Sequence, residues 1–550
     1  MKKFKHLLLK FLPVLFCIPF AIIINIFYYK LQTSYNFVDE HYNILAGYAI
    51  KNGSKLYSDF AFNRQPGMAW ISYLIQEITH PNSLYLYIIR HRLFMIVYSV
   101  VTLIFLSFRF GWYGLGIAVL YESVKFYNFG FTFQAESFSG YLLLYIFGLI
   151  FSQWMNKKIY TIEYYIVTIL TWFLIFTREP YIPLYLFIYA IFLSRVTYNH
   201  DTPQLLKKLQ IKVDRTLVVN VGLLILLNVI TLSCLPLKQY YEQVVGISSH
   251  SVAGSEISDQ GGILGSLLRS ILYPIYILVG SRFSNFHVIL IILTFYIGYT
   301  WNLIFKTIDS KQKYTFLFHS LVLFCILFLS ALRTQDPGTD QYGSYRMNIW
   351  VSAYMSIAVF LFIKQISIIN IIKSKLPSII AILLALYIVI SPRSYLWKEK
   401  QHTIQDSFFI SFNQDEQPGH LLRSIKQPTD TLFVDGYASL IFLSSGIPSA
   451  FPYYVYYPVM QFGQYEKLKN AMFINKPPTF VYFDCQVPRQ YIDFPHSSYS
   501  AGYIELLKNY NNSCLFIRKD RAEKLSSKEK ESLIFYEYTF PQPVKEKQQE

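Results

Sequence analysis

The sequence predicts a multi-span α-helical membrane protein of about eleven transmembrane helices, followed by a small extracytoplasmic α/β domain. Of the 550 residues, 53% are hydrophobic and only 15% are charged, whereas an average soluble domain has about 25% charged residues. The apolar residues fall in runs of about 20, the length that crosses a bilayer as a helix. From residue 393 onward the composition shifts to Asp, Glu, Lys, Pro and Ser. This composition excludes both a soluble single-core enzyme and a disordered chain.

The first apolar run follows a cluster of lysines, which is also how a signal peptide begins. The run is too long for a signal peptide and no small-residue cleavage site follows it, so we predict a retained first span. The predicted spans are 11–29, 94–108, 112–128, 137–153, 160–176, 180–195, 217–237, 285–305, 315–332, 347–364 and 377–392.

The basic residues orient these spans. The chain carries a formal net charge of +16, and Lys and Arg concentrate in the short connections at 157–158, 207–215, 306–313 and 364–375. Cytoplasmic loops carry this excess in membrane proteins. We therefore predict a multi-pass protein of the cytoplasmic membrane, with the N-terminus inside and the C-terminal domain outside. The basic excess is interpreted as a topology signal rather than a nucleic-acid footprint.

One apolar segment, residues 263–281, is apolar enough to span but does not fit this topology. If it spanned, the basic loop 306–313 would move to the outside. We interpret it as an interfacial or re-entrant helix with Arg269 at the head-group level, and the spanning alternative stays open.

Two long stretches do not span, which gives the predicted domain organisation. Residues 1–392 form the transmembrane domain, including a first external loop at 30–93, and residues 393–550 form the α/β domain. The predicted strands of that domain are 431–437, 479–485 and 514–519, with helical stretches at 462–474 and 499–510 between them.

Cysteine usage adds one open question. Cys485 and Cys514 both belong to the domain assigned outside, where they can pair. The sequence leaves the disulfide undecided.

The first external loop is where chemistry is most strongly indicated, because it opens with Asp39, Glu40, His41 and Tyr42. Adjacent carboxylates near a membrane surface are costly to desolvate and need a task or a cationic partner. One of them can act as a general base toward an incoming hydroxyl or amine. The alternative is that both cap a helix and face water.

Arginines recur on the side assigned outside, against the positive-inside trend. Their planar fork suits a phosphate group, although each can instead contact lipid head groups from a helix end. The candidates for binding a phosphate are Arg64, Arg92, Arg178 and Arg346.

Glu136, at the mouth of the 137–153 span, is a further carboxylate at the same level. Its alternative role is to complement a helix dipole. One histidine beside two carboxylates is a weak metal signal, so no metal or other cofactor is predicted, although a divalent cation is not excluded.

Several phrases resemble known membrane glycosyltransferases, and their order along the chain matters more than any one of them. They are D-E-H-Y (39–42), A-G-Y-A-I-K-N-G-S-K-L-Y-S-D-F (46–60), N-R-Q-P-G (63–67), H-R-L-F (91–94), Q-A-E-S-F (134–138), T-R-E-P (177–180) and the tail stretches 434–451 and 475–483. The first is similar to the Asp-Glu motif of the protein O-mannosyltransferase and lipid A aminoarabinose transferase families.

This resemblance implies the C-type glycosyltransferase fold and a sugar carried on a polyprenyl phosphate. It implies transfer with inversion to a lipid, glycan or protein acceptor at the outer face of the membrane. Asp39 matches the catalytic aspartate, with Glu40 in support. The arginines above would bind the donor phosphate, and His41, Tyr42 and Glu136 would line the acceptor or sugar site. Arg64-Gln65 stands where related enzymes often carry His-Pro, which departs from the pattern.

Two other functions remain open. A transporter or flippase for a lipid-linked sugar would explain the spans and the external arginines, but it predicts charges within the spans, and these are nearly absent. A non-enzymatic receptor or scaffold would tolerate changes at Asp39. The sugar, the acceptor, the polyprenol length and the oligomeric state do not follow from the sequence.

Overall fold

A computed structural model describes the chain from Lys2 to Pro541 with gaps. The gaps are 35, 37, 126–129, 195–196, 199–208, 211–214, 247–284, 308–309, 331–346, 370–403, 437, 455, 457–462, 484, 486–491 and 510. Three predicted features therefore lie outside the described residues: the segment 263–281, the span 377–392 and Arg346.

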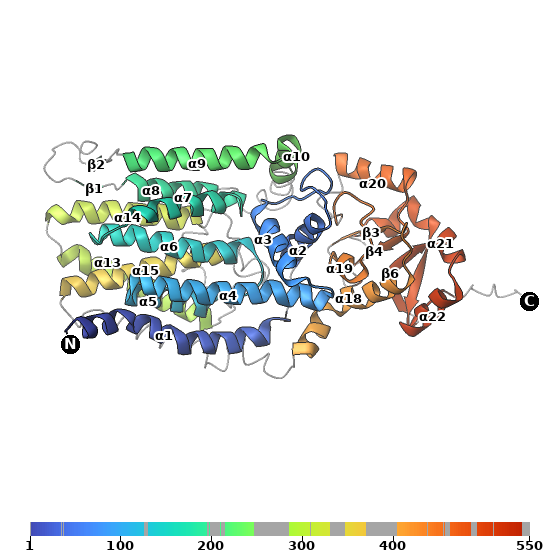
Figure 1. Cartoon of the computed structure of the whole chain (residues 1–550), viewed down its shortest axis with the longest axis horizontal. Helices are drawn as coiled ribbons and strands as arrows, with labels where there is room; N and C mark the ends of the chain where they lie inside the picture. Colours follow the sequence, from blue (N-terminus) through green and yellow to red (C-terminus); the bar gives the residue numbers. More distant parts are fainter. Residues whose placement is uncertain are drawn as a thin grey trace, which may run out of the picture.

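The described part of the transmembrane domain is a bundle of long helices that run side by side (Figure 1). They are α1 (Lys2–Leu31), α4 (Leu84–Phe110), α5 (Trp112–Lys125), α6 (Ala135–Trp154), α7 (Thr161–Ile175), α8 (Ile182–Ser194), α9 (Arg215–Ser233), α13 (Asn285–Thr307), α14 (Ser310–Ser330) and α15 (Met347–Ile369). Each overlaps a predicted span. Within the described residues, four helices are long and apolar enough to cross a membrane, namely α4, α6, α9 and Lys313–Ser330 of α14.

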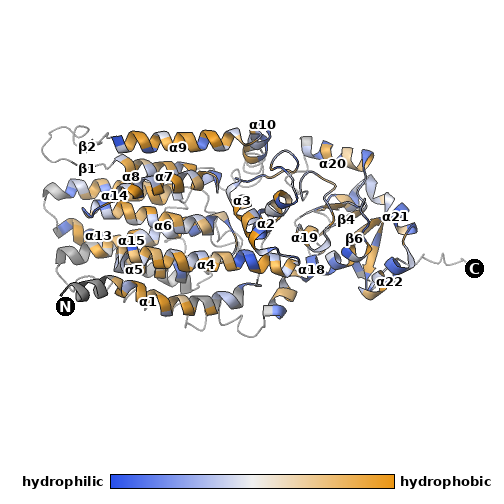
Figure 2. Ribbon diagram, in the orientation of Figure 1, coloured by the Kyte–Doolittle hydropathy of each residue, from blue (hydrophilic) through white to orange (hydrophobic). Residues whose placement is uncertain are grey.

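Position in the bundle decides which faces of these helices are apolar. Helix α6 is almost wholly buried, with Leu143, Ile146 and Ile150 at 0% exposure, and α15 packs against it in the same core. At the periphery, α4 exposes Val97 and Val101. In water such faces would be unfavourable, but in lipid they need no partner. Figure 2 shows that hydrophobic residues predominate along peripheral helices such as α4 and α9.

One ion pair lies inside the bundle, on α5. Lys125 Nζ is 3.0 Å from Glu122 Oε2, and both side chains are 1% exposed. Tyr28 of α1 donates a hydrogen bond of 3.1 Å to Glu122, and Tyr141 of α6 contacts both charges. A buried pair of this kind is tolerated because the two charges and their hydrogen bonds compensate each other. It shows that charge within the spans is scarce but present.

The segment 30–93, which the sequence predicts to be the first external loop, is largely helical. It contains α2 (Val38–Lys51) and α3 (Gly67–Thr79), and α4 already begins at Leu84, so that Arg92 lies inside a helix rather than ahead of a span. A short helix α10 (Leu237–Tyr241) and a π-helical turn η3 (Glu242–Gly246) follow α9 and lie on the same side of the bundle (Figure 1).

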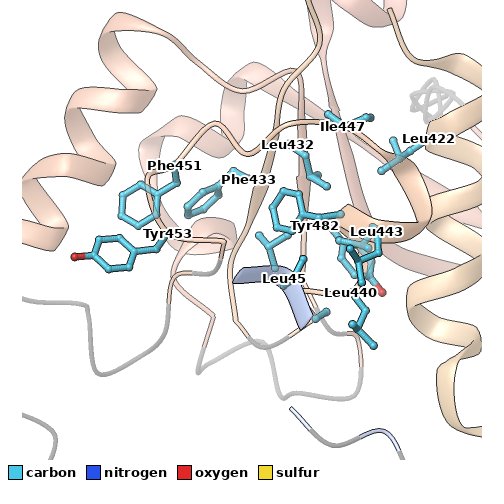
Figure 3. Close-up of a cluster of buried hydrophobic side chains, with 14 of the residues drawn as sticks. Leu45, Leu422, Leu432, Phe433, Leu440, Leu443, Ile447, Phe451, Tyr453 and Tyr482 are labelled. Carbon is cyan, nitrogen blue, oxygen red and sulfur yellow. The ribbon is translucent and has the colours of Figure 1, made fainter. Parts of the chain in front are cut away.

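The loop and the C-terminal domain share one hydrophobic core. Leu45 of α2 belongs to the same buried cluster as Leu432, Leu440 and Phe451, and Figure 3 shows Leu45 beside the side chains of the C-terminal domain. The domain boundary at 393 stays a prediction, because residues 370–403 are outside the described part.

The C-terminal domain has a mixed sheet of order β3-β4-β6-β5-β7, in which β3 and β4 are parallel and the other pairs are antiparallel. The strands are β3 (Leu432–Val434), β4 (Phe480–Tyr482), β5 (Tyr503–Lys508), β6 (Asn511–Arg518) and β7 (Tyr538–Thr539). The helices are α18 (Ile404–Ile425), α19 (Ile441–Ser445), α20 (Gly463–Asn475), α21 (Lys519–Glu523) and α22 (Ser527–Phe535). The short elements are η2 (Glu179–Tyr181), η8 (Phe494–His496), η9 (Ser498–Gly502) and a separate two-stranded sheet of β1 (Thr197–Tyr198) and β2 (Leu209–Gln210).

The prediction of a helix at 499–510 is wrong. A 3-10 turn ends at Gly502, and β5 then pairs antiparallel with β6. The stretch E-L-L-K has good helix formers, but the neighbouring strand supplies hydrogen bonds and buries Tyr503 and Leu506. Sheet formation thus depended on a tertiary partner rather than on local propensity. By contrast, the predicted helix at 462–474 is present as α20.

A disulfide joins Cys485, just after β4, to Cys514 in β6. The two strands are antiparallel neighbours, which brings the two Cα atoms to 5.6 Å, within the ordinary range for a disulfide. The pairing that the sequence left undecided is therefore present.

We expect a thiol reagent applied to native membranes to leave both cysteines unmodified until a reductant is added, after which both react. Labelling would be read by mass spectrometry of the peptides containing Cys485 and Cys514. Cys234, which is exposed and free, serves as the internal control. Modification of either disulfide cysteine without reductant would contradict the pairing.

Asp435, directly after β3, is a buried carboxyl group with one clear hydrogen bond. Its Oδ2 accepts from the Phe494 backbone N–H at 2.6 Å, and the residue is 2% exposed. Burial raises the pKa of Asp435 from 3.8 to about 6, more than that hydrogen bond and the charge of Lys469 lower it. The folded state therefore binds this proton more tightly than the unfolded chain does, and stability falls as the pH rises from about 4 through 6.

We expect Asp435→Asn, which keeps an acceptor for Phe494, to stabilise the protein at pH 8. The unfolding free energy should rise by up to about 3 kcal/mol, and the thermal midpoint should rise with it. The gain should vanish at about pH 3, below both pKa values, where Asp435 is protonated in the folded and the unfolded state. Differential scanning calorimetry of the purified chain between pH 3 and 8 measures this. Asp520→Asn is the control with the opposite sign, because Arg518 lowers the pKa of that exposed carboxyl. A gain that does not depend on pH would refute the assignment.

Candidate active site

The candidate site lies where α2 meets the ends of α4 and α6, between the bundle and the sheet domain (Figure 1). Asp39 and Glu40 are in the first turn of α2, Arg92 is in α4 and Glu136 is in the first turn of α6. Carboxylates in a first helical turn are favoured by the helix dipole. Here each of them also has an arginine partner, so neither Asp39 nor Glu40 is only a water-facing cap.

Asp39 and Arg64 form the solvent-accessible pair of the site. The Arg64 guanidinium binds the Asp39 carboxylate through Nη2 and donates from Nη1 to the Asp39 carbonyl oxygen at 3.0 Å. Its Cζ also lies 5.0 Å from the centre of the Tyr42 ring. The side chains of Arg64 and Asp39 are 15% and 26% exposed. A carboxylate and a guanidinium that water reaches are also within reach of a substrate.

Glu40 and Arg92 form a second pair, which is closed. Arg92 Nε lies 3.1 Å from both Glu40 oxygens, and Nη2 lies 2.6 Å from Oε2. Arg92 Nη1 donates to the carbonyl oxygens of Gln32 and Ser34, at 2.9 and 2.6 Å. Glu40 Oε1 also accepts from the Phe133 N–H at 2.9 Å.

Arg92 and Glu40 are 1% and 0% exposed, so in this structure they face each other rather than solvent. The donor-phosphate role expected of Arg92 and the catalytic role expected of Glu40 stay predictions. Both side chains bind each other and backbone groups of two segments, the stretch 32–34 and Phe133. We assign them to positioning α2, and with it Asp39.

Glu136 and Arg178 form a third pair. Arg178 Nε donates to Glu136 Oε1 at 2.8 Å, and the two side chains are 6% and 3% exposed. The structure thus brings together a residue expected at the phosphate and one expected at the acceptor, but joins them in a buried contact. We assign this pair to fixing the start of α6 against the α7–α8 connection.

His41 is buried beside these charges. It is 1% exposed, and neither ring nitrogen has a hydrogen-bond partner. Burial, together with the nearby charge of Arg92, lowers the pKa of His41 to about 3, although Asp39 acts in the opposite direction. The imidazole is therefore neutral at physiological pH. Its ring centre lies 6.5 Å from that of Phe412 in α18, so His41 faces the C-terminal domain.

Arg64 sits on a loop that residues far along the chain hold in place. Tyr240 of α10 donates to Gln65 Oε1 at 2.8 Å, and Gln243 of η3 donates to the Tyr57 carbonyl oxygen at 3.0 Å. The loop ends at Gly67, where a Cβ atom would approach the Phe176 carbonyl oxygen to 2.6 Å. The sequence analysis did not identify Tyr240 and Gln243. Their contacts are with a loop about 180 residues earlier in the chain, and no motif near them indicates such a contact.

Among the described residues, no group of three His, Cys, Asp or Glu is arranged to hold a metal ion. Arg346 lies outside the described residues, so its assignment stays a prediction.

Comparison with known proteins places this fold. No protein-family model matches the sequence, and no curated protein matches it. Among solved structures, ArnT from Cupriavidus metallidurans bound to undecaprenyl phosphate is similar, with a TM-score of 0.51 and 10% sequence identity over 92% of this chain and 97% of that chain. The apo state of the same protein gives a TM-score of 0.43 and 11% identity over the same shares.

The likeness to the ligand-bound structure confirms the predicted fold class. The chain is mostly helical, with several helices apolar enough to cross a membrane, and it has an ArnT-like fold with a C-terminal mixed-sheet domain. At 10% identity the likeness concerns the fold, so what the site does is argued from its own geometry.

We expect Glu40→Gln to destabilise the protein rather than to impair catalysis selectively. The change leaves the Arg92 charge buried without a counter-charge, and breaking such a pair costs about 3–5 kcal/mol. The measurements are the thermal midpoint and the yield of monodisperse protein in detergent. Glu77→Gln, on the half-buried side chain of α3, is the matched control. A Glu40→Gln protein of normal stability would disprove the positioning role.

Proposed function

We propose that this protein is an integral membrane glycosyltransferase. It transfers a sugar from a polyprenyl-phosphate donor to an acceptor at the outer face of the cytoplasmic membrane, with inversion at the anomeric carbon. The observation that carries the proposal is the accessible Asp39–Arg64 pair, in a chain whose fold resembles that of ArnT, solved with undecaprenyl phosphate bound.

Asp39 has the attributes of a general base. Its carboxylate is held at the start of α2 by the buried Glu40–Arg92 pair next to it, yet it remains 26% exposed. A positioned carboxylate can take the proton of an acceptor hydroxyl or amine as that group attacks the sugar carbon, a contribution of about 10²- to 10⁴-fold in rate. Holding the acceptor at this carboxylate also replaces a bimolecular encounter with an oriented one.

Arg64 is suited to the other half of the reaction. The leaving group is a lipid phosphate that already carries negative charge, and a guanidinium near it stabilises the departing oxygen. In this structure Arg64 binds Asp39, whose carboxylate is one anion available to it. A donor phosphate offers a second anion, so Arg64 can lie between base and leaving group and balance the charge of both.

Tyr42 and His41 would shape the acceptor or sugar site. The Tyr42 ring lies beside Arg64, and an aromatic face of this kind can pack against a sugar ring. His41 is neutral but 1% exposed, so it would shape this site from the packing beneath it rather than by touching a sugar hydroxyl. We propose Arg64 as the donor-phosphate residue among the described arginines, because Arg92 and Arg178 are enclosed with their carboxylates.

The alternative functions gain less support from the structure. A transporter for lipid-linked sugars would use charges along the spans. The buried pair in α5 is compensated by Tyr28 and Tyr141 within the bundle, and it does not explain the accessible Asp39. A receptor or scaffold would not need a carboxylate and a guanidinium kept within reach of water.

We expect Asp39→Asn to lower the transfer rate by about 10²- to 10⁴-fold, since the amide cannot accept the proton, while stability and membrane insertion stay normal. The assay measures transfer of labelled sugar from a panel of polyprenyl-phosphate sugars to membrane acceptors. Asp59→Asn is the matched control, because Asp59 is an exposed carboxylate of the same external loop. Near-normal turnover by Asp39→Asn would overturn the assignment.

A further inference from the structure

The loop that carries Arg64 is fastened by a segment from a distant part of the chain. Three hydrogen bonds make this connection, and a fourth braces the loop internally. Gln243 Nε2 donates to the Tyr57 carbonyl oxygen at 3.0 Å, and Gln243 Oε1 accepts from the Phe62 N–H at 2.9 Å. Tyr240 donates to Gln65 Oε1 at 2.8 Å, and within the loop Tyr57 donates to the Arg64 carbonyl oxygen at 2.6 Å. Together they reach Tyr57, Phe62, Arg64 and Gln65 of this loop.

The backbone of the loop is strained at the point where Gln243 binds. Tyr57 has φ of 69°, in the left-handed region that is rarely adopted by non-glycine residues. It is 1% exposed, and its ring packs edge-on against Tyr240 at 5.2 Å between centres. Strain of this kind, of order 1–3 kcal/mol, persists only where the surroundings enforce it, and it clusters at functional sites.

The fastening segment is itself irregular. Residues Glu242–Gly246 form a π-helical turn directly after α10. Such π-helical turns are rare in proteins, but many of those that occur lie at functional sites. Here the turn places the Gln243 amide where its oxygen and its nitrogen each bind the loop.

We propose that Gln243, together with Tyr240, is a positioning residue for Arg64 in the transfer reaction. This inference rests on the proposed function, since it gives Arg64 the donor phosphate as its partner. The amide of Gln243 binds the Arg64 loop at two points, the Tyr57 carbonyl oxygen and the Phe62 N–H. Tyr240 binds the same loop at Gln65. These contacts hold the loop backbone in one conformation, so that the Arg64 guanidinium is positioned toward Asp39 and the donor phosphate.

The experiment is a double-mutant cycle. The variants are Gln243→Ala, Arg64→Gln and the two combined, and the probe is undecaprenyl phosphate in nanodiscs, alongside steady-state transfer kinetics. Losing the two hydrogen bonds of Gln243 should weaken binding of the probe by about 10-fold. The KM for the donor should rise with it, while the KM for the acceptor should stay within about 2-fold.

If Gln243 acts through Arg64, Gln243→Ala should have no further effect once Arg64 is Gln, because interacting residues give non-additive changes. A purely structural role would lower the fraction of folded protein, and its effect would add to that of Arg64→Gln. Tyr240→Phe removes only the hydrogen bond to Gln65 and tests the same idea if Gln243→Ala does not fold. Tyr241→Phe, at an exposed neighbour in α10, should leave binding and kinetics unchanged.

The outcomes separate this inference from the proposed function. Impaired Arg64→Gln with normal or additive Gln243→Ala overturns the positioning role alone. Normal binding and turnover in Arg64→Gln would overturn the phosphate assignment, and the positioning role with it. Loss in both single variants with no further loss in the double variant supports both.

Discussion

The buried pair of Glu40 and Arg92 is the interaction on which the candidate site depends. The Arg92 guanidinium reaches both Glu40 oxygens and the carbonyl oxygens of Gln32 and Ser34, while Glu40 also accepts from the Phe133 N–H. Two charges withdrawn from water are tolerated only when their hydrogen bonds are made within the protein. The pair is therefore stable only where the end of α1, the start of α2, α4 and the approach to α6 meet.

Two adjacent carboxylates consequently take different roles. Successive residues of a helix point about 100° apart, so while Glu40 faces the packed interior, Asp39 faces the side where the 52–66 loop lies. There it meets Arg64, whose side chain water still reaches. The buried Glu40–Arg92 pair thus fixes the backbone that carries Asp39, while Asp39 and Arg64 themselves stay accessible to water. The Glu136–Arg178 contact does the same for α6, the next helix that faces this region.

Much of the fold was predictable because its signals are local. Apolar runs of span length located the described bundle helices, and the composition shift located the sheet domain, including β3, β4 and β6. Where pairing partners decide, local signals failed. The stretch that forms β5 was predicted to be helical, but in the structure it pairs with β6. The sequence of the 30–93 segment also did not indicate that α2 shares a core with Phe451. For the candidate site, Asp39 and Arg64 could be named from the sequence, but their pairing could not.

The sequence by itself determined the class of protein and the residue types at the site, because hydropathy, charge bias and short motifs are properties of the chain alone. Only the tertiary structure decided which arginines remain available. Arg64, Arg92 and Arg178 are chemically identical side chains, and they differ in whether a carboxylate encloses them out of reach of water. The same holds for Tyr240 and Gln243, which gain a role only because folding places them against a loop distant in sequence. Burial and long-range hydrogen bonding are set by packing, and packing is not written in any local stretch of residues.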